Sequence, residues 1–285
     1  MTCRSTGFAM LASACPQEAM DLGAVAHLSA IKARHPFMHF FDGFRTSHEL
    51  QKIDALDYED LRPLVDMDQL NAFRKHSLNP EHPHVRGTTA SSETFFQGRE
   101  AGNGHYDAIP DIVQHYMDEI NKLTGRNYKL FDYYGAPDAE EVVVVMGSGA
   151  ETARETVDYL MSQGRKVGMI SVHLFRPFSA KHFLAVLPET VRKVAVLDRT
   201  KESGSVGEPL YLDVKAVLTG SGRSFDTIVG AASVWPPRIP PPARSSPCTT
   251  TWSRPSPRTA SPSGIVDDVD LLPPCPARTS SCPRR

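Results

Sequence analysis

The chain has 285 residues, of which 40% are apolar and 22% charged, a composition typical of globular proteins with one large domain or two ordinary ones. Its formal net charge of −2 gives no electrostatic basis for binding nucleic acid or an anionic membrane. No apolar run approaches the roughly 18 to 20 residues that span a bilayer, so we expect no membrane partner.

The cysteines show no CxxC spacing, which argues against a zinc site, a redox motif or an iron–sulfur cluster within this chain. We therefore expect no metal-binding residues, and a reducing compartment such as the cytoplasm or an organelle matrix. An alternative for the N-terminus, MTCRSTGFAMLASACPQEAM, is a transit peptide, because no acidic residue precedes Glu18. The five cysteines are Cys3, Cys15, Cys248, Cys275 and Cys282.

Residues 1–57 have an α/β pattern. Pro16 suits the first turn of a helix, and Glu18 favours the positive end of its dipole. The apolar residues that follow form a face too wide for a surface helix, so we expect burial on two sides. A strand is predicted over residues 37–41, and Asp42-Gly43 is a strong turn signal that ends it.

Residues 58–137 are less regular. YEDLRPLV and DMDQLNAFRK predict short helices, and LNPEHPHVRG predicts a proline-stiffened loop. A further helix is predicted over residues 110–123, with Gly125 placed to stop it. We expect this block to be a connector that wraps over a neighbouring surface.

Residues 138–230 alternate between strands and helices. EVVVVM at 141–146 is a β-branched run typical of a strand buried on both faces of a parallel sheet. Helices are predicted at 151–163, 180–187 and 207–218, and further strands at 166–172, 191–197 and 225–229. This alternation predicts βαβ units and a doubly wound sheet, so the fold class is α/β.

Residues 231–285 differ from the rest. Nine of the 33 residues between 231 and 263 are proline, and no periodicity is present. Such a segment cannot bury enough apolar surface to offset its ordering entropy, so we expect a disordered tail. We interpret it as the product of a frame-shifted or misjoined gene.

Two loops follow buried strands. Gly147-Ser148-Gly149 opens a helix, so it is either a structural turn or an anion site formed by free backbone N–H groups. A dinucleotide fingerprint requires a further glycine where the chain has Thr152. LDRTKESGSVGEP, residues 197–209, fits a functional loop and an inter-domain contact equally well.

Three other features each have a functional and a structural interpretation. His76, His82 and His84 lie close in sequence, but no acidic or cysteine partner has ligand spacing, and we assign no metal to them. The stretch HPFMHFFDGFRTSHE either marks an active site or ends a buried strand. Arg4 is either a surface residue or, beside the hydroxyl of Ser5, part of a carboxylate clamp.

Long sequence words carry a family resemblance. RSTGFAML, QEAMDL, HFFDGFRTSHE, NPEHPHVRG, FQGREA, TGRNYKLFDYYGAPDAE, RPF and VLDRTKESG resemble, in order and spacing, pyruvate:ferredoxin (flavodoxin) oxidoreductase. The resemblance extends from about Arg4 to Gly230. Within it, HFFDGFRTSHE is a strand end with interface value rather than a catalytic motif.

The resemblance implies a fragment of a long, multidomain, homodimeric enzyme. That family decarboxylates pyruvate on thiamine diphosphate with Mg²⁺, passes electrons through [4Fe–4S] clusters to ferredoxin or flavodoxin, and forms acetyl-CoA from coenzyme A. Residues 1–57 are similar to the end of its thiamine-diphosphate-binding, pyrimidine-type domain. Residues 138–230 are similar to a domain II that is like the C-terminal domain of transketolase.

The resemblance also bears on individual residues. The family's cofactor-activating acid lies upstream of residue 1, and its Mg²⁺-diphosphate site and cluster cysteines lie downstream. The chain alone is therefore expected to be inactive, without catalytic residues, and its cofactor-binding residues are not identified. Arg4 matches the family's arginine that binds the pyruvate carboxylate, although the family usually has Gln where this chain has Ser5. Alternatives are a non-catalytic interaction fragment and a related 2-oxoacid or NADP-linked oxidoreductase.

Overall fold

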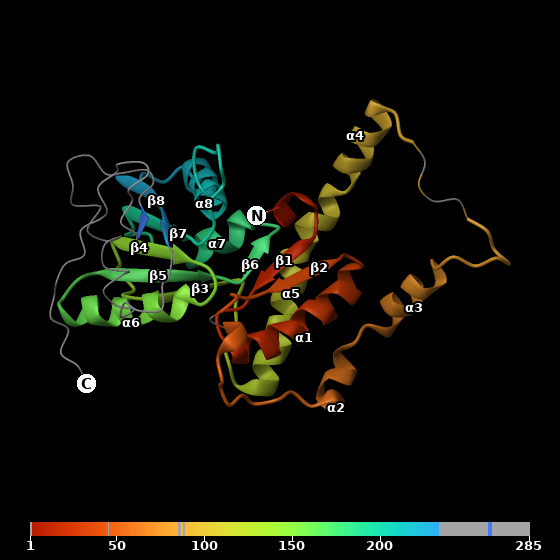
Figure 1. The fold of residues 1–285 in the computed structure, drawn as a ribbon, viewed down its shortest axis with the longest axis horizontal. Coiled ribbons are helices and arrows are strands. Elements are labelled where there is room, and N and C mark those ends of the chain that lie inside the picture. The colour runs from red at the N-terminus through yellow and green to blue at the C-terminus, as the bar shows by residue number, and fades with distance from the viewer. Residues whose placement is uncertain (1, 45, 85–86, 88, 234–261, 264–285) are drawn as a thin grey trace.

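A computed structural model of the chain describes residues 2–44, 46–84, 87, 89–233 and 262–263. These residues form a three-stranded sheet and a six-stranded sheet, with helices around both (Figure 1). No helix among them is both long and apolar enough to cross a membrane. The predicted α/β class is confirmed.

The three-stranded sheet has the order β2-β1-β6. Its central strand β1 (Ala9–Ala12) pairs in parallel with β2 (Phe37–Phe40) and antiparallel with β6 (Leu174–Arg176). All four residues of β1 are buried. The strand had no counterpart in the sequence prediction, because four residues give too short a pattern and a short 3-10 helix (Thr2–Ser5) precedes it.

Helix α1 (Pro16–Ala33) connects β1 to β2. As predicted, Pro16 occupies its first turn. Cys15 is at the N-cap position, and its side chain makes no capping hydrogen bond. The helix packs against β2 on one side and against α5 on another, which explains its wide apolar face. It ends at Arg34, which has a left-handed backbone conformation with φ of 51°.

The connector begins with short helices, of which α3 and α4 extend away from both sheets in Figure 1. The predicted short helices are present as α2 (Tyr58–Leu61), a 3-10 turn (Arg62–Leu64) and α3 (Met67–Lys75). Helix α4 (Ser92–Ala101) was not predicted, and its residues are exposed. A second 3-10 helix (Thr46–His48) follows β2.

Helix α5 (Asn103–Thr124) is longer than predicted. Its predicted start was Pro110, because proline favours a first turn, but Pro110 lies inside the helix. Burial of Ile109, Val113 and Met117 against α1 offsets the backbone hydrogen bond that the proline removes. Gly125 ends the helix in a left-handed conformation, as expected.

The six-stranded sheet has the order β3-β5-β4-β7-β8-β9. All neighbouring strands are parallel except β3, which runs antiparallel to β5 at one edge. Strand β3 lies within the residues predicted to be a connector. The strands are β3 (Phe131–Gly135), β4 (Glu141–Val145), β5 (Val167–Val172), β7 (Lys193–Asp198), β8 (Thr227–Ser233) and β9 (Pro262–Ser263).

Helices cover both faces of this sheet, which confirms the predicted doubly wound arrangement. Helix α6 (Gly149–Ser162) packs on one face, against residues such as Val143 and Val145. Helices α7 (Ala180–Val186) and α8 (Pro209–Gly220) pack on the other, against Val144 and Val196. The core between the sheet and helices α7 and α8 is continuous with the core of the three-stranded sheet. One body of buried apolar residues therefore supports both sheets.

The C-terminal part differs from the prediction at two places. Strand β8 continues to Ser233, four residues past the predicted strand end at Val229, because Ala231 and Ala232 pair with Leu197 and Asp198 of β7. Strand β9 pairs with the end of β8. The rest of the predicted disordered tail, residues 234–261 and 264–285, lies outside the described residues. The boundaries 1–57, 58–137 and 138–230 stay predictions.

Candidate functional site

The turn between β4 and α6 meets a carboxylate from the other sheet. Gly147 has φ of +77°, and the Ser148 N–H at the start of α6 donates to Asp42 Oδ2 at 2.6 Å. Asp42 belongs to HFFDGFRTSHE and lies two residues after the end of β2. A helix N-terminus stabilises negative charge, and the Asp42 carboxylate occupies the position that a bound anion would take. Of the two interpretations of GSGAE, this contact favours the turn.

Arg199, directly after β7, completes this arrangement. Its Nη1 lies 2.7 Å from Asp42 Oδ2, and the same nitrogen donates to Ser148 Oγ at 3.1 Å. Strands β4 and β7 are neighbours, and the chain leaves them in opposite directions, from β4 to β5 on one side and from β7 to β8 on the other. The carboxyl ends of such strands are where open α/β sheets place ligands. The predicted LDRTKESG loop therefore contacts the other sheet through its arginine.

A cavity of about 430 Å³ lies between the two sheets at this point. Strands β1 and β2 form one wall, and the ends of β4 and β7 form the opposite wall. The lining is mostly apolar, with a few charged groups, Asp42, Asp198 and Arg199, which is the usual character of a small-molecule site. The residues that line it include Cys3, Met10, Ser13, Met38, Phe40, Asp42, Gly147, Leu197, Asp198, Arg199, Thr200 and Leu210.

Arg4 lies in the 3-10 helix beside this cavity, one residue after Cys3. Its Nη2 is 3.0 Å from Glu202 Oε2, and the arginine side chain is 26% exposed. Glu202 belongs to the loop that follows β7. The structure therefore places Arg4 in an ion pair between the two sheets, and not on an open surface as its bare sequence context suggested.

Asp198 supplies the cavity wall with a buried carboxyl group. The backbone N–H groups of Leu210 and Tyr211, in the first turn of α8, each donate to it at 3.0 Å. Burial nevertheless raises the pKa of Asp198 to about 6. Because both of its oxygens accept backbone hydrogen bonds, this carboxyl group holds the first turn of α8 at the cavity wall. The sequence signal was its place at a strand end within LDRTKESG.

Glu208 holds the loop from the other side. It accepts a hydrogen bond from the Glu202 backbone N–H at 2.6 Å, and its carboxylate lies 2.9 Å from Lys201 Nζ. The Glu208 side chain is only 4% exposed. These contacts join the middle of the loop, at Lys201 and Glu202, to its end at Glu208. They help to hold Glu202 in a defined position facing the three-stranded sheet.

A second charged cluster surrounds His173, between β5 and β6. His173 Nδ1 donates to the Lys129 carbonyl at 2.7 Å, and Nε2 lies 3.4 Å from Glu18 Oε2. Asp132 of β3 is 3.6 Å from Nδ1. Burial alone would lower the pKa of His173, but attraction to Glu18 and Asp132 outweighs it and raises the pKa to about 9.

The His173 cluster was missed in the sequence because its members come from three distant elements. Glu18 belongs to α1 and accepts a hydrogen bond from the Ala14 N–H at 2.6 Å. The fully buried imidazolium lies where the chain passes from one sheet to the other. A single histidine within a buried run was the only signal, and by itself it does not identify partners.

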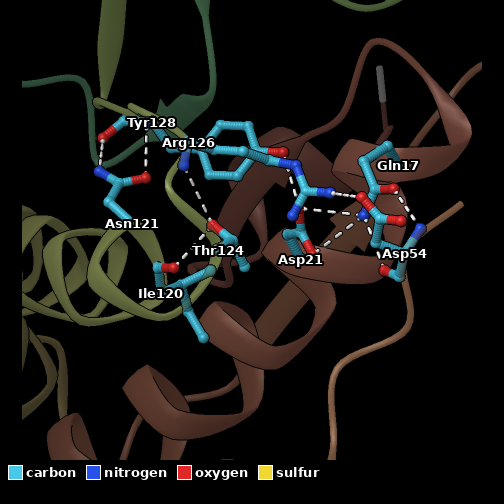
Figure 2. Close-up of polar contacts among 8 residues, drawn as sticks. All are labelled: Gln17, Asp21, Asp54, Ile120, Asn121, Thr124, Arg126 and Tyr128. Carbon is cyan, nitrogen blue, oxygen red and sulfur yellow. Dashed lines mark hydrogen bonds and ion pairs between the residues drawn. The ribbon is translucent and has the colours of Figure 1, made fainter.

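Figure 2 shows a third polar network, at the end of α5. The buried Asp21 carboxylate accepts from the Tyr128 hydroxyl at 2.7 Å and lies 3.2 Å from Arg126 Nη1. Arg126 also pairs with Asp54 at 2.8 Å, and Gln17 binds the Asp54 backbone. Burial and the Asp21 carboxylate raise the pKa of Tyr128. This network fastens the turn after α5 to α1, and its role is structural.

A larger cavity, about 760 Å³, opens between the end of α1 and the α4–α5 junction. Its basic lining resembles an anion site, but Lys32 is paired with Asp66 at 2.7 Å. Arg34 contacts His76 at 3.4 Å. Arg99, which also lines this cavity, lies over the Phe95 ring. We place the candidate site in the cavity between the sheets, because the carboxyl ends of β4 and β7 meet there.

The remaining predicted features lie apart from that cavity. His76 contacts the Ala72 carbonyl at 2.7 Å, within α3 and its end. Among the residues the structure describes, no group of three or more His, Cys, Asp or Glu side chains is arranged to hold a metal. Ser47 Oγ is 2.7 Å from His48 Nδ1, but both side chains are exposed and Glu49 is not part of the contact.

Two family models match the chain. One, described as the thiamine-diphosphate-binding domain of pyruvate flavodoxin/ferredoxin oxidoreductase, matches residues 1–118. The other, core domain II of pyruvate:ferredoxin oxidoreductase, matches residues 139–234. The first includes β1, α1 and β2, and the second includes β4 to β8.

Curated relatives agree with these matches. The pyruvate:ferredoxin oxidoreductase of Moorella thermoacetica is 60% identical over 230 residues, covering 81% of this chain and 20% of the relative. The pyruvate-flavodoxin oxidoreductase of Klebsiella pneumoniae is 51% identical over 284 residues, covering 96% and 24%. A pyruvate dehydrogenase [NADP(+)] of Cryptosporidium parvum is 51% identical over 230 residues, covering 80% and 12%. The chain spans a quarter or less of the length of each.

Proposed function

Because this chain belongs to the pyruvate:ferredoxin (flavodoxin) oxidoreductase family, we propose that it forms part of an enzyme that oxidatively decarboxylates pyruvate. The observation that carries the proposal is the pair of consecutive family matches, over residues 1–118 and 139–234. Each match includes one wall of the cavity between the sheets. In the proposed reaction, pyruvate and coenzyme A yield acetyl-CoA and CO₂, and the electrons pass to ferredoxin or flavodoxin.

Thiamine diphosphate would supply the carbanion chemistry of this reaction. The described residues do not fit its diphosphate, because Asp42 occupies the helix N-terminus that most resembles an anion site. We propose that the diphosphate, Mg²⁺ and the [4Fe–4S] clusters are held by other parts of the enzyme, and that residues 1–57 supply the end of the domain around the cofactor.

Arg4 is the proposed substrate-binding residue. Arg4 follows Cys3, which lines the cavity, and a guanidinium can form the paired hydrogen bonds that a carboxylate accepts. In the structure Glu202 already provides a carboxylate at 3.0 Å. We propose that pyruvate takes the place of Glu202, so that Arg4 exchanges one carboxylate for another and is never left without a counter-charge.

The partners and the compartment are also part of this proposal. The names of two relatives indicate ferredoxin and flavodoxin as electron acceptors of those proteins. We propose the same acceptors here, a homodimeric enzyme, and a cytoplasmic or organelle-matrix location, consistent with the free thiols of Cys3 and Cys15.

The test is a graft of residues 2–233 into the corresponding segment of the Moorella thermoacetica relative. We expect pyruvate-dependent reduction of a viologen dye that requires coenzyme A and thiamine diphosphate, within about tenfold of the parent enzyme. The isolated chain should give no reduction, because it spans only a fifth of that relative. A folded graft with bound cofactors and no pyruvate oxidation would contradict the proposal.

A further inference from the structure

The N-terminus of α6 has the parts of an anion-binding site. The Ser148 N–H and the Arg199 guanidinium converge on one oxygen of Asp42, at 2.6 and 2.7 Å. The Ser148 hydroxyl accepts a hydrogen bond from the same arginine, which fixes its orientation. A Cβ atom on Gly147 would lie 2.9 Å from Asp42 Oδ1, so glycine leaves the space in which the carboxylate sits.

The donors and the acceptor of this site come from different sheets. Asp42 follows β2 of the three-stranded sheet, whereas Ser148 and Arg199 follow β4 and β7 of the six-stranded sheet. The Asp42 and Arg199 side chains are 17% and 26% exposed, so water only partly screens the pair. The contact therefore joins the two sheets at the edge of the cavity that both of them line.

A second ion pair sets the orientation of the loop after β7 relative to the three-stranded sheet. Arg199 pairs with the negative Asp42, and three residues later Glu202 pairs with the positive Arg4. Sliding the loop along the three-stranded sheet would bring like charges together, which is unfavourable. The alternation of signs therefore specifies one register between the loop and the sheet.

We propose that Asp42 is a positioning residue that acts as the resident anion of a carboxylate site built by α6 and Arg199. Through Arg199 it places the loop of residues 199–202 against the three-stranded sheet. The inference goes beyond the proposed function, because it concerns how the two halves of the cavity are held together and requires no turnover.

The test uses small carboxylates as replacements for the missing side chain. Asp42→Ala should lower the Tm of the full chain, and acetate should reverse part of the loss. A saturable rise of about 3 °C is expected at an acetate concentration about tenfold above its Kd. Sodium chloride at equal ionic strength should not reproduce the rise. The parent protein should show no such rise, because its own carboxylate fills the site.

Two further variants make the test specific. Asp42→Ala combined with Arg199→Gln should lose the acetate effect, because the guanidinium that holds the anion is gone. Glu59→Gln breaks an exposed pair with Arg62, whose side chains are 73% and 75% exposed, and should respond to acetate as the parent does. An equal acetate effect in the parent, Asp42→Ala and the double variant would overturn the proposal.

Amide exchange gives an independent measurement if Asp42→Ala does not fold. Asp42→Asn keeps an acceptor for Ser148 but loses the charge that binds Arg199. Because charge-assisted hydrogen bonds are about twice as strong as neutral ones, the Ser148 amide should exchange about tenfold faster than in the parent. An unchanged exchange rate would show that the carboxylate does not hold this turn, and the proposal would be wrong.

Discussion

Replacing His173 by glutamine should remove a pH-dependent contribution to stability. The imidazolium is enclosed by Glu18 of α1, by Asp132 of β3 and by the Lys129 carbonyl. Arg154 of α6 also acts on both carboxylates, and it lowers the pKa of each. Glutamine keeps the size of the side chain and a hydrogen-bond donor, so the change mainly removes the charge.

The magnitude follows from the pKa of His173. A folded-state pKa raised from 6.5 to about 9 corresponds to about 3 kcal/mol of stabilisation. Because the pKa is raised, this contribution is fully present below about pH 6.5 and is lost as the pH rises through about 9. Without the charge, Glu18 keeps the hydrogen bond from the Ala14 N–H, and Arg154 still acts on both carboxylates.

The assay is urea unfolding of the parent and of His173→Gln at about pH 6 and about pH 9.5. Between these two pH values the free energy of unfolding of the parent should fall by about 3 kcal/mol more than that of His173→Gln. Comparing the two proteins cancels the contributions of groups that titrate in both. His115→Gln, an exposed histidine on α5, is the matched control and should follow the parent. If the parent and His173→Gln lose equal stability over this range, the histidine is not held protonated and the reasoning fails.

Three further predictions follow from the cavity. In the grafted enzyme, Arg4→Ala should lower kcat/KM for pyruvate by about 10- to 1000-fold, and Arg4→Lys should recover part of the loss, as steady-state kinetics would show. Gly147→Ala should cost at least about 1 kcal/mol in urea unfolding. It should cost more than Gly164→Ala, which has a similar φ of +79° but open space around it. Asp198→Asn should reduce the loss of stability expected for the parent as the pH rises from about 4 to about 6. The pKa of the Asp198 carboxyl group is raised in the folded protein, so its ionisation over this range destabilises the fold.

Strong local patterns predicted most of the second sheet. Residues 141–145 form a strand because a β-branched run buried on both faces has few alternatives, and Gly125 ends α5 because it adopts a left-handed conformation. The elements that were missed are short or depend on distant partners. Strands β1 and β6 have four and three residues, and each is stabilised by pairing with the other.

The candidate site was predictable only in part. The sequence indicated a loop at the end of a parallel strand, and this loop contains Arg199 and Glu202. It did not indicate that Asp42, more than 100 residues away from Ser148, would supply the anion for the α6 N-terminus. Local patterns describe the donor of such a contact but not its acceptor, because the acceptor is chosen by tertiary packing.

Three groups of charged residues lie where the chain passes between the sheets or at the cavity between them. Strand β5 leads through His173 into β6, so one continuous segment contributes a strand to each sheet. The His173 cluster lies at this crossing, and the Asp42–Arg199 and Arg4–Glu202 pairs lie at the cavity. Apolar packing alone allows neighbouring bodies to slide, whereas charged pairs of alternating sign favour one register. The cavity therefore owes its shape to a few charged residues, and substitutions of these residues should alter it before they unfold either sheet.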